Sequence, residues 1–261
     1  MTTKLFIIGV CISFSHLLNA QNNNAAIDSL FHKAFRTYTY APERQKILDS
    51  IILIDPKNAY AWQQKAMPLF KMKKYEIALP YLDSAVKYDK DFHWHPYRAF
   101  MKCIFMKAYR ASLEDFNVID KKYWNYRVMD HSFDFYRALC YLQLNQLDSA
   151  LIFSTISIER DEKTFKKAHY LEYFYKGIIL MEQGKYLNAI ETLDLSIGEY
   201  PQFSDAWYYK SLIYRFLKEK ESSEVCFKNA KEFFQKGYTI NEDNVYYELY
   251  PYQINRYIYD Y

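Results

Sequence analysis

Few residues of this sequence have the types and spacing of a catalytic or metal-binding motif. The two nearest histidines are His93 and His95, one on each side of Trp94. On a helix, residues two apart point to different sides, and no third ligand follows at a spacing typical of a metal site. We therefore interpret His93 and His95 as loop histidines, and the sequence predicts no metal ligand.

Nucleophiles and paired acids lack supporting neighbours as well. Cys103, Cys140 and Cys226 lie far apart on apolar stretches, so small buried hydrophobes are favoured over a disulfide framework. No serine stands in a G-x-S-x-G turn, and the adjacent Glu114 and Asp115 indicate a solvated helix face. The sequence thus predicts a protein that is not an enzyme, with no catalytic residue and no cofactor.

The composition excludes several classes of protein. The chain has 261 residues, of which 51% are hydrophobic and 25% charged, so a sizeable core is expected. Only five residues are glycine, whereas dinucleotide- and phosphate-binding loops need clustered glycines. So little glycine, with seven prolines, also disfavours an all-β protein with many turns. The most unusual excess is aromatic: the chain has 28 tyrosines.

Residues 1–20 have the layout of a secretory signal peptide. Lys4 supplies a positive start, an apolar run follows from Leu5 to Phe14, and Ala20 precedes the expected cleavage site. The run is too short for a membrane span, which takes about 20 apolar residues. A buried N-terminal helix is the alternative. We expect an exported protein, periplasmic or extracellular, with no stable membrane span after cleavage.

The charge balance argues against a nucleic-acid partner. The chain carries 34 Lys and Arg against 31 Asp and Glu, a net charge of +3. Removal of residues 1–20 takes away Lys4 and no acid, which leaves +2. A near-neutral exported chain lacks the basic surface that binds nucleic acid.

The sequence pattern repeats about every 34 positions, and the repeating unit sets the structure of most of the chain. Aromatic, small and aliphatic residues recur in the same order in blocks that begin near residues 25, 59, 93, 131, 170 and 204. Apolar residues spaced three and four apart, as at Ile190, Leu193 and Ile197, are typical of helices. Each helix pair needs neighbours to bury its apolar faces. The pattern predicts an all-α solenoid of about six helix–turn–helix repeats.

The landmarks of each block resemble the tetratricopeptide repeat. The best copy reads Tyr173-x3-Gly177-x2-Leu180-x3-Gly184-x-Tyr186-x2-Ala189-x3-Leu193-x2-Ser196-x4-Pro201. The resemblance extends over about residues 25–237, and several positions recur together. It implies helix pairs stacked into a right-handed superhelix.

The N-terminal pattern and the repeats together divide the chain into three segments. They are the signal peptide at 1–20, a repeat domain at 21–237 and a tyrosine-rich tail at 238–261. Two steps between repeats are longer, at 38 and 39 residues. We expect solvated connections at 121–130 and 160–167, because both stretches are charged.

In the family that the sequence resembles, the first helix of each repeat lines a concave groove. Carried over by spacing, these positions are mostly aromatic, aliphatic or methionine, which favours an apolar or aromatic peptide, or a partner helix. The alternative is that these residues are simply core. The predicted groove residues are Tyr60, Met67, Phe70, Trp94, Tyr97, Met101, Phe105, Phe135, Leu139, Phe174, Ile178, Tyr208 and Arg215.

The resemblance implies a non-enzymatic protein-interaction scaffold whose partner is another protein or peptide. The alternative is an exported small-molecule or glycan-binding protein that uses the aromatic groove residues.

The tail fits no repeat. It has eight tyrosines among 24 residues, and Pro251 argues against one long helix. A terminal repeat exposes its apolar face unless another segment covers it. We therefore expect residues 238–261 to fold back over the last repeats or into the groove; an exposed tail that docks on a partner is the alternative.

Overall fold

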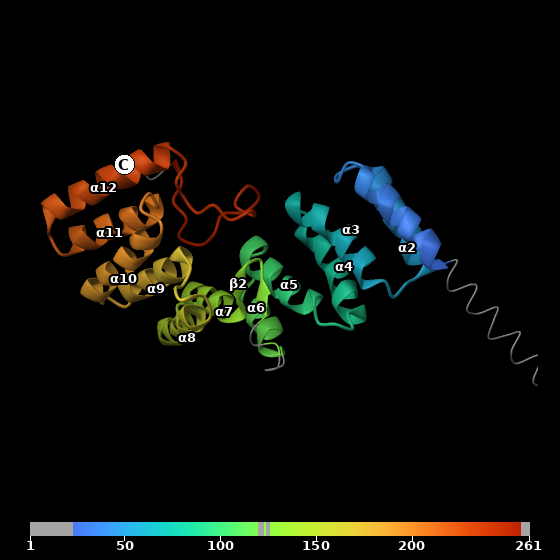
Figure 1. Ribbon diagram of the computed structural model, residues 1–261, viewed down its shortest axis with the longest axis horizontal. Coiled ribbons are helices and arrows are strands. Elements are labelled where there is room, and N and C mark those ends of the chain that lie inside the picture. Colours follow the sequence, from blue (N-terminus) through green and yellow to red (C-terminus); the bar gives the residue numbers. More distant parts are fainter. Residues whose placement is uncertain (1–22, 120–122, 124–125, 257–261) are drawn as a thin grey trace, which may run out of the picture. The chain divides into compact units, whose positions relative to one another are not determined.

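The structure is a computed structural model, and it describes residues 23–119, 123 and 126–256. The predicted signal peptide lies outside the described residues. Helices joined by short turns dominate the described part, with one two-stranded hairpin (Figure 1). The predicted all-α class is confirmed. No helix among the described residues is long and apolar enough to cross a membrane.

The chain forms two compact units, and the first comprises residues 1–94. Its helices are residues 23–36, α2 (Pro42–Ile54), α3 (Ala59–Lys71) and α4 (Tyr75–Tyr88). Helix α3 begins where the Asn58 side chain accepts a hydrogen bond from the Ala61 amide at 3.0 Å. Ala66 and Ala78 are buried where α3 packs on α4, which fits the small residues expected at these positions.

The second unit comprises residues 95–261. Its elements are α5 (Trp94–Phe100, which begins one residue earlier), the π-helix η1 (Met101–Phe105), α6 (Tyr109–Asn117), β1 (Arg127–Val128), β2 (His131–Ser132), α7 (Phe133–Gln143), α8 (Leu147–Phe165), α9 (Tyr170–Glu182), α10 (Tyr186–Glu199), α11 (Ser204–Phe216) and α12 (Lys220–Gln235). Consecutive helices of this unit pack as neighbouring pairs from α7 to α12.

The same left-handed turn joins the helices of five pairs. The residue in this turn has a positive φ, and it is Lys73, Lys107, Asn145, Gly184 or Lys218. The next amide closes the turn, as where the Lys185 N–H donates to the Leu180 carbonyl at 2.9 Å. A left-handed residue other than glycine costs about 1–2 kcal/mol, which the closing bonds offset. A chain with five glycines can therefore make five tight turns.

Gly177 allows a close approach of α9 to α10. A Cβ atom at this position would lie 2.8 Å from Cγ of Leu193, inside the normal contact distance. Leu193 is fully buried, so it has little room to move. This glycine is needed for packing between helices and not for a turn.

All three described cysteines are buried free thiols, as the apolar surroundings predict. The structure adds one contact that their spacing hides. The Sγ atoms of Cys103 and Cys140 lie 3.5 Å apart, although the residues are 37 positions apart in sequence.

The expected connection at 160–167 is helical over most of its length, although residues 162–167 are exposed as predicted. Helix α8 continues to Phe165, and Lys166 ends it with a φ of 69°. Asp161 is buried because the Arg127 guanidinium donates two hydrogen bonds to its carboxylate, at 2.7 and 3.1 Å. Arg127 belongs to the other stretch that was expected to be solvated, so the two stretches meet in space.

Candidate functional site

The predicted groove residues differ widely in exposure. Phe70, Met101, Phe105, Phe135, Leu139, Phe174 and Ile178 are buried, Met67, Trp94, Tyr97 and Tyr208 are half-buried, and Tyr60 and Arg215 are exposed. The buried members pack as core, so a partner can reach them only if other side chains move. Their role in partner binding stays a prediction.

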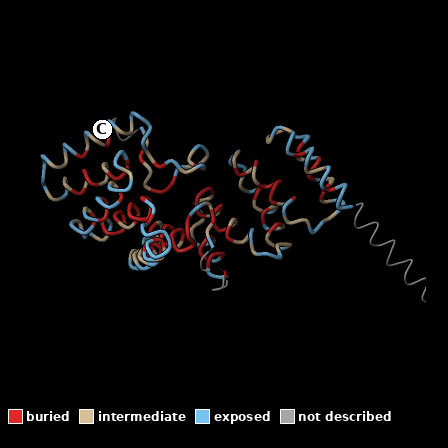
Figure 2. Tube along the Cα trace, in the orientation of Figure 1, coloured by how far each residue is buried: buried red, intermediate tan, exposed pale blue. Residues whose placement is uncertain are grey.

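Residues 238–256 pack against the first helices of the last two pairs. The Tyr175 hydroxyl of α9 donates a hydrogen bond to the Pro251 carbonyl at 2.8 Å, and Tyr252 packs on Tyr209 of α11 with ring centroids 5.7 Å apart. Ile240, Tyr250 and Ile254 of this segment are at most 2% exposed. Figure 2 shows these buried stretches of the segment, and α9 is mostly buried as well.

Asp205, at the start of α11, holds two separate parts of the tail. Its carboxylate accepts hydrogen bonds from the Ile254 amide and from the Thr239 hydroxyl, each at 2.8 Å. The side chain is fully buried. Burial raises the pKa of Asp205 to about 6, although these hydrogen bonds act in the opposite direction.

A cavity of about 670 Å³ lies where the tail meets the two stretches that were expected to be solvated. It is lined by Arg127, Asp130, His131, Asp161, Phe165, Lys167, Ala168, His169, Tyr170, Glu199 and Glu242. Its charged side chains are partly neutralised, since Arg127 pairs with Asp161 and the Lys167 ammonium lies 2.5 Å from a Glu199 carboxylate oxygen.

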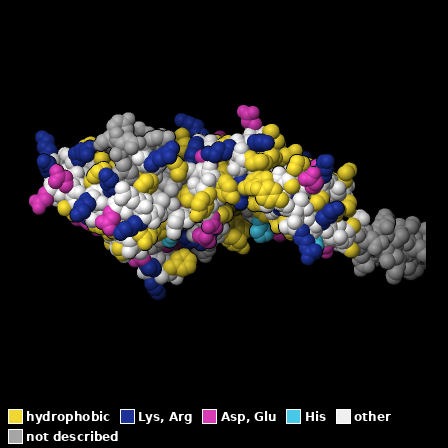
Figure 3. Space-filling view, turned by 90° about the horizontal axis from the view of Figure 1, so that it is seen from above, with side chains coloured by type: hydrophobic (Ala, Val, Ile, Leu, Met, Phe, Trp, Pro, Cys, Tyr) yellow, Lys and Arg dark blue, Asp and Glu magenta, His cyan; other side chains and the backbone are white. Residues whose placement is uncertain are grey.

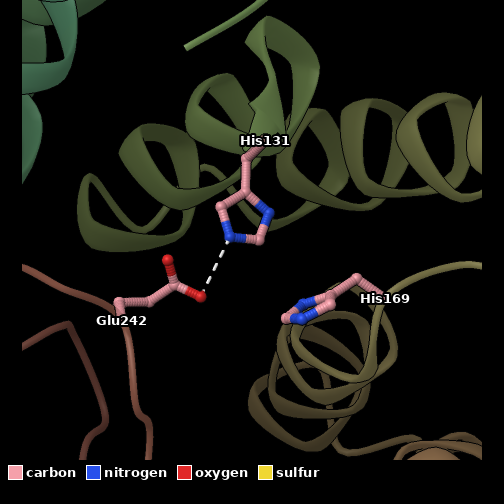
Figure 4. A group of neighbouring side chains, drawn as sticks. All are labelled: His131, His169 and Glu242. Atoms are coloured by element: carbon pink, nitrogen blue, oxygen red, sulfur yellow. Dashed lines mark hydrogen bonds and ion pairs between the residues drawn. The ribbon is translucent and has the colours of Figure 1, made fainter. Parts of the chain in front are cut away.

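His131 lies between two carboxylates at one wall of this cavity. Its Nε2 atom is 3.3 Å from Oε1 of Glu242, and its Nδ1 atom is 3.9 Å from Oε1 of Glu172. The imidazole is 2% exposed and stacks on the Phe135 ring at 4.2 Å. Figure 4 shows His169 near His131, and the two ring centroids are 5.3 Å apart.

The surroundings shift the pKa values of the two histidines in opposite directions. Burial lowers the pKa of His131, but the neighbouring carboxylates of Glu172 and Glu242 outweigh it and raise this pKa to about 9. Burial and the charge of His131 lower the pKa of His169 to about 4. In turn, burial raises the pKa of Glu172, whereas contact with His131 outweighs burial and lowers that of Glu242.

The sequence did not reveal this cluster. His131 and Glu242 are 111 positions apart, and His169 stands at the end of the block that begins at His131. No local spacing joins them, whereas His93 and His95 lie only two positions apart. The one sequence feature that points to this place is the charge of the two longer connections at 121–130 and 160–167, which by itself predicts only solvated loops.

No protein-family model matches the chain. Over 66 residues it is 33% identical to the uncharacterized protein MJ0572 of Methanocaldococcus jannaschii, and the match covers 25% of this chain and 74% of that protein.

Solved structures of helical-repeat proteins share the fold. PilW, described as a widely conserved type IV pilus biogenesis factor, matches with a TM-score of 0.61 and 13% identity over 84% of this chain and 94% of its own. YrrB, described as a TPR protein with an unusual peptide-binding site, matches with a TM-score of 0.51 and 17% identity, over 71% of this chain and 91% of its own.

The stacked helix pairs and their left-handed turns define an α-solenoid. Together with the recurring residues around Tyr173, Gly177 and Ala189, it gives the chain the fold of tetratricopeptide-repeat proteins, which is the fold that the resemblance implies.

Proposed function

We propose that this protein is a non-enzymatic interaction scaffold that binds an apolar or aromatic peptide segment on its first unit. The observation that carries this proposal is a cluster of stacked aromatic side chains, Phe31, Phe35, Tyr60 and Trp94, which we call the aromatic patch. Tyr60 and Trp94 stack with ring centroids 6.0 Å apart, and Phe31 lies 5.3 Å from Tyr60.

The aromatic patch is partly exposed to solvent, whereas most of the predicted groove residues of the second unit are buried. Phe35 is 51% exposed and Tyr60 is 42% exposed. Figure 3 shows hydrophobic side chains reaching the surface among charged ones. Contiguous exposed aromatic surface is unusual in a stable monomer and is typical of a site that a partner covers. The peptide-binding site of YrrB, whose fold is similar, supports the same class of partner.

The mechanism of binding follows from the side chains. Partly buried rings are already held in place by their neighbours, so little side-chain freedom is lost when a partner covers them. An apolar or aromatic side chain of a peptide would stack on Tyr60 or Trp94 and remove both surfaces from water. Few charges are needed for this recognition.

Replacement of the patch tests this proposal. A Tyr60→Ala, Trp94→Ala double variant is expected to lose at least about tenfold in affinity for peptides selected on the wild-type chain, since hot-spot aromatics contribute about 2 kcal/mol or more. Tyr246→Ala is the control, because Tyr246 is an exposed aromatic (90%) outside the patch. Equal capture by the double variant and the wild type would contradict the proposal, and binding of oligosaccharides instead of peptides would favour the glycan alternative.

Export of the chain is part of this proposal. We expect mass spectrometry of the protein from its native source to find an N-terminus after Ala20, because residues 1–20 have the charge and apolar pattern of a signal peptide. An N-terminus before residue 15 in exported protein would contradict cleavage at this place.

A further inference from the structure

We propose that His131, His169 and Glu242 bind a divalent transition-metal ion, and that Zn²⁺ suits the site best. Each of the three side chains offers one ligand atom, and these atoms lie within 4.8 Å of one another. Two imidazole nitrogens and one carboxylate oxygen form a donor set typical of zinc sites that keep an open fourth position.

Three different elements bring these ligands together. His131 belongs to β2, His169 immediately precedes α9, and Glu242 lies in the tail (Figure 4). The 3.3 Å between Nε2 of His131 and Oε1 of Glu242 is close to the ~3.4 Å expected for two ligands of one tetrahedral zinc. His169 is exposed, so its side chain can turn toward the same point without disturbing the core.

Glu172 supplies the partner that a metal-bound histidine needs. Metal-binding histidines usually donate their second ring N–H to a carboxylate or a carbonyl. Glu172 is 1% exposed and faces Nδ1 of His131 at 3.9 Å. Among the described side chains, neither Nδ1 of His131 nor either carboxylate oxygen of Glu172 has a hydrogen-bond partner. An ion on Nε2 would leave the imidazole proton on Nδ1, where Glu172 can accept it after a small shift.

His169 also accepts a long hydrogen bond from the backbone, and metal binding can replace this contact. The Leu171 amide donates to Nδ1 of His169 at 3.5 Å, which is long for a hydrogen bond. A neutral imidazole has one free lone pair, so metal binding through Nε2 would displace this contact at little cost. The neighbouring cavity of about 670 Å³ gives the ion a path and space for a water molecule in the fourth position.

The position of Glu242 gives such an ion a structural consequence. Glu242 belongs to the segment that packs against α9 and α11, while both histidines belong to the helical repeats. An ion shared by the three side chains would therefore hold the tail on the repeats. Without an ion, the same groups form the ion pair of His131 with Glu242 alone.

Zinc titration of the full chain tests the site. After removal of metals with a chelator, calorimetry with ZnCl₂ at neutral pH is expected to show one ion per chain and a rise in melting temperature. His169→Gln and Glu242→Gln are expected to weaken zinc binding by at least about tenfold, and Glu172→Gln by about 10–100-fold. His93→Gln is the matched control, because it removes an exposed histidine outside the cluster and is expected to change nothing.

His169→Gln decides the outcome if Glu242→Gln or Glu172→Gln proves unstable, because the exposed His169 side chain contributes little to the core. Its melting temperature in chelator should equal that of the wild type, while the zinc-induced rise is lost. Absence of stoichiometric zinc binding to the wild type, or equal affinity of His169→Gln, would overturn the proposal.

Discussion

A chain that ends at Gly237 is expected to unfold at a melting temperature at least about 10 °C below that of the full chain. Ile240, Tyr250 and Ile254 are almost completely buried, and each large apolar side chain contributes about 1.5–3 kcal/mol when it is buried. Their loss removes several kcal/mol, and 1 kcal/mol corresponds to about 2–4 °C in a chain of this size. Thermal unfolding followed by circular dichroism measures this difference.

The loss also uncovers the side chains beneath the tail. Tyr175 is buried in α9 and would be left with an unpaired hydroxyl, and increased binding of a hydrophobic dye is expected. A chain that ends at Arg256 is the matched control, because it keeps every described tail contact. A synthetic peptide of residues 238–261 should restore stability if the short chain stays soluble. Equal melting temperatures of the full and Gly237-terminated chains would contradict a stabilising tail.

Asp205→Ala is expected to lower the free energy of unfolding by about 2–4 kcal/mol at pH 4. The substitution leaves the buried Ile254 amide without an acceptor and removes the partner of the Thr239 hydroxyl. An unsatisfied buried donor costs about 1–3 kcal/mol. The loss should be smaller at pH 7, because the wild type there carries the cost of a buried charge that the variant lacks. Urea denaturation at the two pH values measures both.

Asp205→Asn separates the charge from the hydrogen bonds. The pKa of Asp205 is about 6 in the folded chain against 3.8 ordinarily, so the native state binds the carboxyl proton more tightly than the unfolded state does. Its stabilising effect is present below pH 4 and is lost as the pH rises to 6, by up to about 3 kcal/mol. The difference in stability between wild type and Asp205→Asn should therefore change across this range. A constant difference would show that Asp205 does not titrate there.

The contrast between Gly177 and Asn145 shows which local features could be anticipated. Gly177 stands in the repeat motif, and its place beside Leu193 follows from the need for close helix packing. Asn145 takes the left-handed turn that Gly184 takes in the next repeat, although its own residue type does not require it. The turn is held by a backbone hydrogen bond, here from the Gln146 N–H to the Tyr141 carbonyl at 2.9 Å, so glycine can be replaced there.

The sequence by itself determined the helix pairs, because apolar spacing and small residues act over a few turns of one helix. It also predicts that the tyrosine-rich tail packs on the repeats, but it does not determine whether the tail lies over the last repeats or in the groove. Only the tertiary structure brought His131, His169 and Glu242 together and buried Asp161 under Arg127. Those contacts join residues far apart in sequence, and local periodicity carries no information about charges that meet through folding. Arg127 and Asp161, one from each charged stretch, are an example, because their pairing buries a carboxylate that local charge alone predicts to be solvated.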